Sequence, residues 1–268
     1  PSPEWLDRPA PALIVQPVGA ADVCTAVAFA RSYGLLTAVK CGGHSFSGQS
    51  TCDGGLQIDL SLLRGVRVDP TARRVWVAGG SLLGAVDHEA LALGLAAPLG
   101  TVSHTGVGGL TTAGGFGRLS RRFGLALDNV VSVDIVTADG TLRRASADEN
   151  RDLYWAVRGG GGNFGIVTAF EFQLHPVERQ VIGGTILFPG SSARELLQRY
   201  AEASLAAPDE LYIDTFVAYP RGKPAVCGFD VCYSGPARDA ERVLAPLRKV
   251  GTPLLDRIAA VDYVALQR

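Results

Sequence analysis

The sequence has 268 residues, of which 47% are hydrophobic, and its 25 basic and 26 acidic side chains give a formal net charge of −1. This composition predicts a globular protein with a sizeable core and excludes an intrinsically disordered chain. The scattered charges leave no basic surface for nucleic acid, and the apolar runs are too short and too rich in glycine to cross a membrane.

The first part of the sequence alternates strands and helices. In chain order we predict a strand over 12–17, a helix over 20–33, strands over 35–40 and 54–61, a hairpin over 66–77 and a helix over 81–95. The strand over 54–61, GGLQIDLS, alternates as a half-buried strand does. In the hairpin, Val66 and Val68 should oppose Val75 and Val77 across an Asp-Pro turn.

The second part changes in character near residue 179. Before it we predict a hairpin over 129–146, a short helix over 149–159 and a buried, then alternating, strand over 162–177. After it glycine becomes rarer, and we predict strands over 181–187, 211–218 and 225–233 with helices over 192–206 and 236–248. The sequence therefore predicts two domains, 1–178 and an α+β domain over 179–268. The second domain looks incomplete, because VDYVALQR still has the pattern of structured sequence.

The 33 glycines gather at 42–55, 79–84, 100–117 and 158–165. Glycine lets the backbone approach another group closely, so four such clusters suggest a large ligand held by main-chain groups. The loop KCGGHS, residues 40–45, offers consecutive N–H groups between glycines, an arrangement that suits an anion. Glycines that only turn a tightly packed sheet are the alternative.

Two other interpretations of these motifs fit the sequence less well. GHSFS, residues 43–47, approaches the G-x-S-x-G motif of a serine hydrolase with Ser45 as nucleophile, but no helix is predicted behind it. RGGGGNFG, residues 158–165, approaches a dinucleotide fingerprint, yet it follows a helix and precedes a strand, the reverse of the required order.

Three stretches in order resemble the FAD-linked oxidases of the vanillyl-alcohol-oxidase (p-cresol methylhydroxylase) superfamily, and within it the berberine-bridge-enzyme-like branch. They are GGHSFSGQSTCDGGLQIDLS, GVGGLTTAGGFGRLSRRFGLALDNV and DLYWAVRGGGGNFGIVTAFEFQLHPV. The resemblance implies an α+β protein with a PCMH-type FAD-binding domain of two α/β subdomains, followed by a partial substrate domain with an antiparallel sheet. It also implies FAD, joined covalently to His44 through the flavin 8α-methyl group.

The resemblance also implies which residues bind FAD. The loop after the second strand would wrap the diphosphate, the segments around 100–117 would line the diphosphate and the isoalloxazine, and the last segment would meet the adenine end. The implied set is Lys40, Cys41, Gly42, Gly43, His44, Ser45, Gly48, Pro98, Gly100, Thr101, Val102, His104, Thr105, Gly106, Gly108, Gly109, Gly114, Gly115, Gly117, Gly162, Gly165, Ile166 and Val167.

Some positions depart from the family pattern. Val102 stands where many members carry a cysteine bonded to the flavin, so we expect no second covalent link. Cys41 stands where Arg, Ser or Gly is common, and we expect a small packed thiol. His104 could face the flavin or bond its own loop. His88 should be a solvated helix residue, and His175 a residue at a strand end.

The resulting prediction is an FAD-dependent oxidase that passes hydride from a small alcohol, sugar or polyketide-like substrate to flavin N5 and then to O2. Tyr212 and Asp214, on one face of a strand, are candidates for the base, with Tyr219 beyond them. A flavin-binding protein without turnover is the alternative. No metal is expected. Five cysteines without a C-x-x-C pair, and no visible signal peptide, favour a reducing, cytoplasmic compartment.

Overall fold

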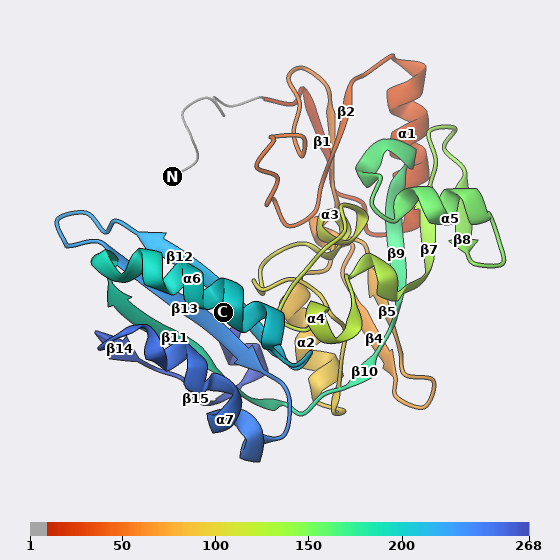
Figure 1. The fold of residues 1–268 in the computed structure, drawn as a ribbon. Coiled ribbons are helices and arrows are strands. Elements are labelled where there is room, and N and C mark those ends of the chain that lie inside the picture. Colours follow the sequence, from red (N-terminus) through yellow and green to blue (C-terminus); the bar gives the residue numbers. More distant parts are fainter. Residues whose placement is uncertain (1–9, 268) are drawn as a thin grey trace.

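The computed structural model describes residues 10–267. Helices and sheets segregate into two bodies that lie side by side (Figure 1). The chain up to Gln173 builds the first body from two sheets, and residues from Gln180 onward build the second around a sheet of its own. The mixture of helices with largely antiparallel sheets agrees with the predicted α+β class.

A small parallel sheet of order β1-β3-β2 begins the first body. Its elements are β1 (Leu13–Val15), α1 (Ala20–Ser32), β2 (Thr37–Lys40) and β3 (Leu56–Asp59). All four residues of β3 are buried, so the prediction of a half-buried strand was wrong. The reason is tertiary: β3 lies between β1 and β2, and Val23, Ala26 and Ala30 of α1 share its core.

A five-stranded antiparallel sheet of order β4-β5-β9-β7-β8 forms the rest of the first body. Its strands are β4 (Val66–Asp69), β5 (Arg74–Ala78), β7 (Val130–Val136), β8 (Leu142–Ser146) and β9 (Ile166–Gln173). Val66 faces Val77 and Val68 faces Val75, which confirms the predicted hairpin register. The central strand β9 carries Phe170 and Phe172 into the main core, where their rings stack with centroids 5.5 Å apart.

Four short helices connect these strands: α2 (Leu83–Leu91), α3 (Val107–Thr112), α4 (Ser120–Phe123) and α5 (Arg151–Val157). The helix predicted over 81–95 is shorter than expected. It ends at Leu91 because Gly94, with a φ of +70°, turns the chain out of the helix.

The second body is a five-stranded antiparallel sheet of order β12-β13-β11-β14, with β15 also paired to β11. Its elements are β11 (Gln180–Pro189), α6 (Ala193–Ala206), β12 (Leu211–Ala218), β13 (Val226–Tyr233), α7 (Ala240–Leu244), β14 (Leu255–Asp256), β15 (Ala259–Asp262) and α8 (Tyr263–Leu266). The helix predicted over 236–248 is broken into α7 between two 3₁₀ turns. Pro246, in the second turn, lacks the N–H that would continue the α-helix.

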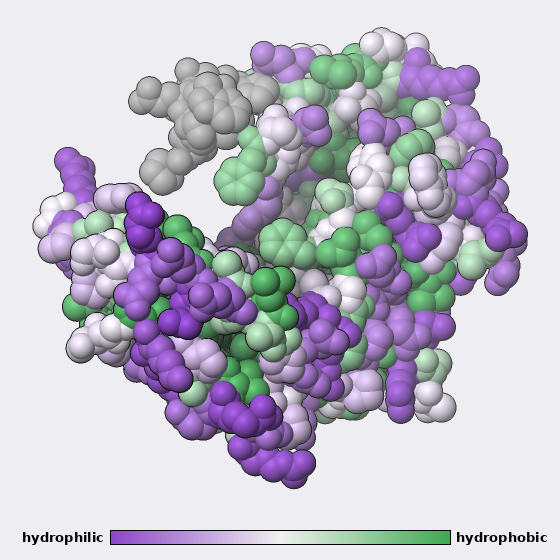
Figure 2. Space-filling view, in the orientation of Figure 1, coloured by the Kyte–Doolittle hydropathy of each residue, from purple (hydrophilic) through white to green (hydrophobic). Residues whose placement is uncertain are grey.

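The two bodies meet through a shared apolar cluster and a short bridge. β6 (Leu95–Ala96) pairs with β10 (His175–Pro176) where the chain passes from one body to the other. Leu91 and Leu119 of the first body pack in one cluster with Cys232 and Tyr263 of the second. Figure 2 shows a hollow between the two bodies and a largely hydrophilic outer face where α6 and α7 lie.

No helix within residues 10–267 has both the length and the apolar character needed to span a membrane.

Candidate functional site

The first wall of the candidate site is the loop that follows β2. Residues 41–48 form neither helix nor strand, and Gly43 and Gly48 each have a φ of +74°. Within residues 10–267, the backbone amides of Gly43, His44 and Ser45 donate to no acceptor. Consecutive free amides beside a glycine with positive φ form a concave anion site. The loop therefore has the donors that a diphosphate requires.

The second wall is the segment 97–106, which runs into α3. Its end is fastened to the start of α2, because Leu83 N donates to Thr105 O at 3.0 Å and Val107 N donates to Ser81 O at 2.9 Å. This wall lies against the first at two glycines. A Cβ atom on Gly42 would lie 2.2 Å from Gly106 N, and one on Gly106 would lie 2.3 Å from Gly42 N. Only glycine permits this approach.

Other glycines of the predicted set face open space. A Cβ atom on Gly109 or on Gly162 would meet nothing within 4 Å, and one on the exposed Gly43 would meet only Lys40 Cε, at 3.8 Å. Packing within the described chain therefore does not explain these glycines. Free amides on the first wall and the bare backbone of Gly109, in α3 just after the second wall, fit a cofactor with a diphosphate and a flat ring, as FAD has.

The glycines of residues 114–117, which belong to the predicted FAD-binding set, form a turn after α3. Gly114 and Gly115 have φ values of +118° and +74°, and a Cβ atom on Gly117 would lie 2.0 Å from Leu99 O. The carbonyls of Gly114 and Gly115 accept from Leu127 N and Ala126 N, at 3.0 and 2.7 Å. The turn is thus anchored to the body.

His44 lies within the first wall and meets His104 of the second. Nε2 of His44 is 2.6 Å from Nδ1 of His104, and both side chains are exposed. The structure therefore brings together two predicted site residues that are sixty positions apart in the sequence. His88 is exposed on α2, as predicted, and His175 hydrogen-bonds Asn129 at 2.6 Å and stacks on Phe123.

Lys40 and Cys41 are held by the protein itself. Lys40 Nζ pairs with Asp59 Oδ2 at 2.9 Å. Burial would raise the pKa of Asp59, but the bonds from Lys40 and the Ser61 amide outweigh it, and the pKa is lowered. Cys41 Sγ lies 3.2 Å from Gly79 O, and burial raises the pKa of its thiol. Cys41 is therefore packed against the chain, as expected. Its raised pKa keeps the thiol protonated and unreactive.

Ser45 lacks the surroundings of a hydrolase nucleophile. Its Oγ lies 3.2 Å from Ser47 Oγ, and residues 41–55 contain no helix. A nucleophile elbow needs a helix directly behind the serine and a base beside it. The structure thus argues against the hydrolase interpretation.

The remaining residues of the predicted FAD-binding set differ in how far they are buried. Pro98 and Gly100 are buried, whereas Val102 is 36% exposed. Ile166 and Val167 point into two separate cores, so they could offer only backbone atoms to a ligand. Gly165, with a φ of +143°, turns the chain sharply into β9 just before them.

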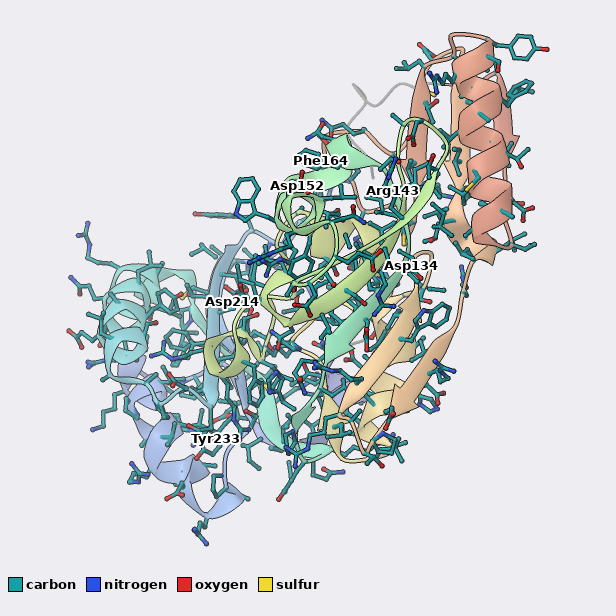
Figure 3. The ribbon with its side chains drawn as sticks, turned by 90° about the vertical axis from the view of Figure 1, so that its right-hand side faces the viewer. Asp134, Arg143, Asp152, Phe164, Asp214 and Tyr233 are labelled. Carbon is teal, nitrogen blue, oxygen red and sulfur yellow. The ribbon has the colours of Figure 1, made fainter. Side chains whose placement is uncertain are left out.

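The predicted base candidates lie on β12, on the face turned away from α6 (Figure 3). Tyr212 Oη donates to Asp214 Oδ2 at 3.3 Å, which confirms that they share a face. Burial raises the pKa of Tyr212 far above its ordinary value, and the nearby Asp214 raises it further. Asp214 is exposed, and Tyr219 lies beyond the end of the strand and is 82% exposed.

Arg118 is a residue that the sequence did not single out. It follows the glycine turn, is 8% exposed, and lies 5.5 Å from the centroid of the Tyr212 ring. Its guanidinium donates to Asp230 Oδ2 at 2.6 Å and to Gln267 Oε1 at 3.0 Å. A single arginine after a glycine turn carries no sequence signal of this role, because its hydrogen-bond partners are more than a hundred positions away.

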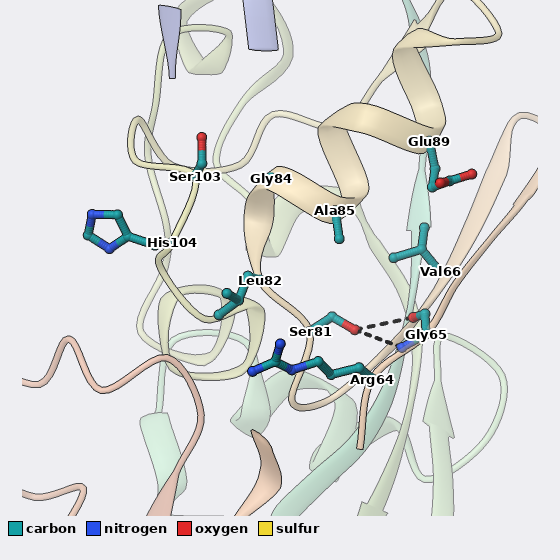
Figure 4. A pocket seen from close by; sticks show the side chains of 10 residues that line it. All are labelled: Arg64, Gly65, Val66, Ser81, Leu82, Gly84, Ala85, Glu89, Ser103 and His104. Atoms are coloured by element: carbon teal, nitrogen blue, oxygen red, sulfur yellow. Dashed lines mark hydrogen bonds between the residues drawn. The ribbon is translucent and has the colours of Figure 1, made fainter. Parts of the chain in front are cut away.

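A cavity of about 550 Å³ lies next to the second wall (Figure 4). It runs between α2 and the start of β4, and Ser81 Oγ closes one side by bonding the backbone of Gly65. Its lining includes Arg64, Leu82, Glu89, Ser103 and His104. His104 therefore lies between this cavity and His44.

Comparison with known proteins agrees with this geometry. Residues 11–146 match the family model described as an FAD binding domain. An FAD-linked oxidoreductase of Dictyostelium discoideum is 38% identical over 96% of this chain and 56% of its own length. Berberine bridge enzyme-like D-1 of Nicotiana tabacum is 37% identical over 80% of this chain and 39% of its own.

A solved structure has the same fold. The crystal structure of 6-hydroxy-D-nicotine oxidase from Arthrobacter nicotinovorans matches with a TM-score of 0.90 at 35% identity, over 95% of this chain and 56% of that one. This chain thus spans about half the length of the relatives it matches. The family match, the fold and the glycine-lined walls agree: the chain belongs to the FAD binding domain family, and its relatives include FAD-linked oxidoreductases and berberine bridge enzyme-like proteins.

Proposed function

We propose that the protein is an FAD-dependent oxidase whose flavin is covalently attached through His44. A small organic substrate would give up hydride to the flavin, and O2 would accept the electrons. Residues 1–178 would form the FAD-binding domain and 179–268 part of the substrate domain. Bound FAD supplies the redox chemistry, while the chain binds and orients the flavin and moves protons.

The observation that supports this proposal best is the setting of His44. Its imidazole is exposed, lies within the run of unpaired amides of residues 43–45, and meets His104 of the second wall. A cofactor with its diphosphate on those amides would bring its ring system close to this loop. An exposed imidazole there can act as a nucleophile toward that ring system.

The sheet face that carries Tyr212 and Asp214 suits the substrate side. With its raised pKa, Tyr212 keeps its proton at neutral pH and donates it to Asp214. Asp214 is therefore the member of the pair that can accept a proton from a substrate. We propose it as the base, with Tyr212 as the residue that orients it.

The cysteines support our proposal of a reducing compartment such as the cytoplasm. All five are free thiols within the described residues, and Cys52, Cys227 and Cys232 are buried. Free buried thiols are common in proteins of reducing compartments.

Reduction of the bound flavin tests the proposed activity. The purified protein should be yellow, should bleach anaerobically with a suitable alcohol, sugar or polyketide, and should regain its colour with release of peroxide when O2 enters. Yellow protein that no member of a broad substrate panel bleaches would contradict turnover and favour a binding protein. Colourless protein that takes up no added FAD would contradict the cofactor as well.

A further inference from the structure

The contact between His44 and His104 restricts the chemistry of the pair. The two nitrogens are 2.6 Å apart, and the ring centroids are 4.6 Å apart at an interplanar angle of 33°. At this distance the contact is a hydrogen bond, which requires a proton on one nitrogen and a lone pair on the other. Nδ1 of His44 makes no hydrogen bond within the described residues.

The direction of this hydrogen bond decides whether His44 can act as a nucleophile. When Nε2 of His44 carries the proton and donates it to His104, Nδ1 of His44 keeps its lone pair. In the opposite arrangement the proton of neutral His44 sits on Nδ1, and Nε2 is occupied by the proton of His104. Neither nitrogen can then attack. Only the first arrangement is reactive, and its nucleophilic atom is Nδ1.

The pair is not needed to hold the two walls together. Both rings are exposed, and a hydrogen bond between exposed groups contributes little to stability. The walls are already in contact at Gly42 and Gly106, and the turn before His104 is closed by Thr105 N donating to Val102 O at 3.0 Å. The pair is thus free to serve the chemistry.

We propose that His104 is the proton-accepting partner that directs flavin attachment to Nδ1 of His44, an inference that rests on the covalent link proposed above. Nδ1 forms a bond to the 8α carbon, and the 8α C–H and the His44 Nε2–H bonds break. The Nε2 proton passes to His104. The flavin keeps the two electrons and the proton of the 8α C–H bond and is left reduced. Dioxygen then takes these two electrons, that proton and the proton held by His104, and becomes hydrogen peroxide.

Attachment kinetics test the role of His104. Protein produced without riboflavin is mixed with FAD. Covalent attachment is measured over time as the flavin that stays with the protein after acid denaturation. Non-covalent binding is measured separately, as the FAD bound before denaturation. His104→Ala should still bind FAD but attach it roughly a hundredfold more slowly, within the usual range for loss of a general base. His88→Ala, which removes an exposed histidine outside the pair, should attach FAD at the wild-type rate.

Two further measurements separate proton acceptance from simple positioning. His104→Asn places an amide oxygen near the site of Nδ1 but takes up no proton, so its attachment rate should be intermediate and should lose the wild-type dependence on pH. Added imidazole should accelerate His104→Ala but not His88→Ala, because the cavity next to His104 gives a small base access to His44.

The linked atom gives an independent answer. In NMR spectra of the histidyl-flavin released by digestion, the 8α methylene protons should correlate with the imidazole Cγ carbon, which marks Nδ1. Correlation with Cδ2 would mark Nε2 and overturn the inference, as would His104→Ala attaching FAD within about twofold of the wild-type rate. Wild-type protein without any covalent flavin would instead contradict the proposed function, and this inference with it.

Discussion

Asp87 is a carboxyl group in the interior, on α2. It is 1% exposed, and its Oδ2 has no hydrogen-bond partner within the described residues. Burial raises its pKa to about 7 from the ordinary value of 3.8, and a hydrogen bond with Gln267 offsets this only in part. The native state thus holds a proton that the unfolded chain gives up. The free energy of unfolding should therefore fall as the pH rises from about 4 to about 7.

Asp87→Asn should remove this dependence, because the amide does not ionise. We expect the variant to be more thermostable than the wild type at about pH 8 and to lose that advantage toward about pH 4, where both side chains are neutral. Melting followed by circular dichroism over this range measures it, with the exposed Asp152→Asn as control. If the melting temperatures of wild type and Asp87→Asn change with pH in the same way, the ionisation of Asp87 does not destabilise the folded protein, and the prediction is contradicted.

At this scale the sequence predicts the chemistry of single residues better than their partners. The motif around His44 singled it out as a candidate site residue. Cys41 has the packed environment expected of a small thiol. The pairing of His44 with His104 and the burial of Asp87 depend on how distant segments meet. Neither residue carries a local pattern that reveals its neighbour.

At the scale of elements, the glycines of the two walls have different physical tasks. Gly42 and Gly106 let two backbones touch, whereas Gly109 leaves open space at the start of α3. The register of the hairpin over 66–77 was predictable because alternation and turn residues are local. The full burial of β3 was not, because it depends on which strands become its neighbours.

Alanine at these glycines should separate folding from cofactor binding. Gly106→Ala places a Cβ atom 2.3 Å from Gly42 N and 2.4 Å from Cys41 Sγ, so the walls must move apart, and the melting temperature of flavin-free protein should fall. Gly109→Ala meets no protein atom and should leave that temperature unchanged or slightly higher, since alanine favours a helix, yet it should weaken FAD binding. Full FAD affinity in Gly109→Ala would place the cofactor elsewhere.

At the scale of the whole molecule, Arg118 joins the first body to the second. It leaves the glycine turn of the first body and bonds Asp230 on β13 and Gln267 after α8. Gln267 in turn donates to Gly100 O at 2.7 Å, and Ser103 N donates to Gln267 O at 2.9 Å. The second wall of the candidate site is thus tied to the second body. The motifs predicted the order of these parts along the chain, but the link itself is a product of folding.

Arg118→Gln should loosen this link. It leaves Asp230 without its cation and lowers stability by roughly 1–3 kcal/mol. The connection near residue 178 should also become more sensitive to protease. Arg143→Gln breaks the exposed pair with Asp139 and should change stability by less than about 0.5 kcal/mol. Equal melting temperatures and cleavage rates for the two variants would contradict the role of Arg118.

The mass of the denatured protein tests the central claim most directly. Wild type purified with its flavin should be heavier than its sequence by one FAD, and the modified peptide should contain His44. His44→Ala should have the mass of its sequence alone while still binding FAD before denaturation. An unmodified wild type, or an adduct that survives in His44→Ala, would contradict covalent attachment through His44.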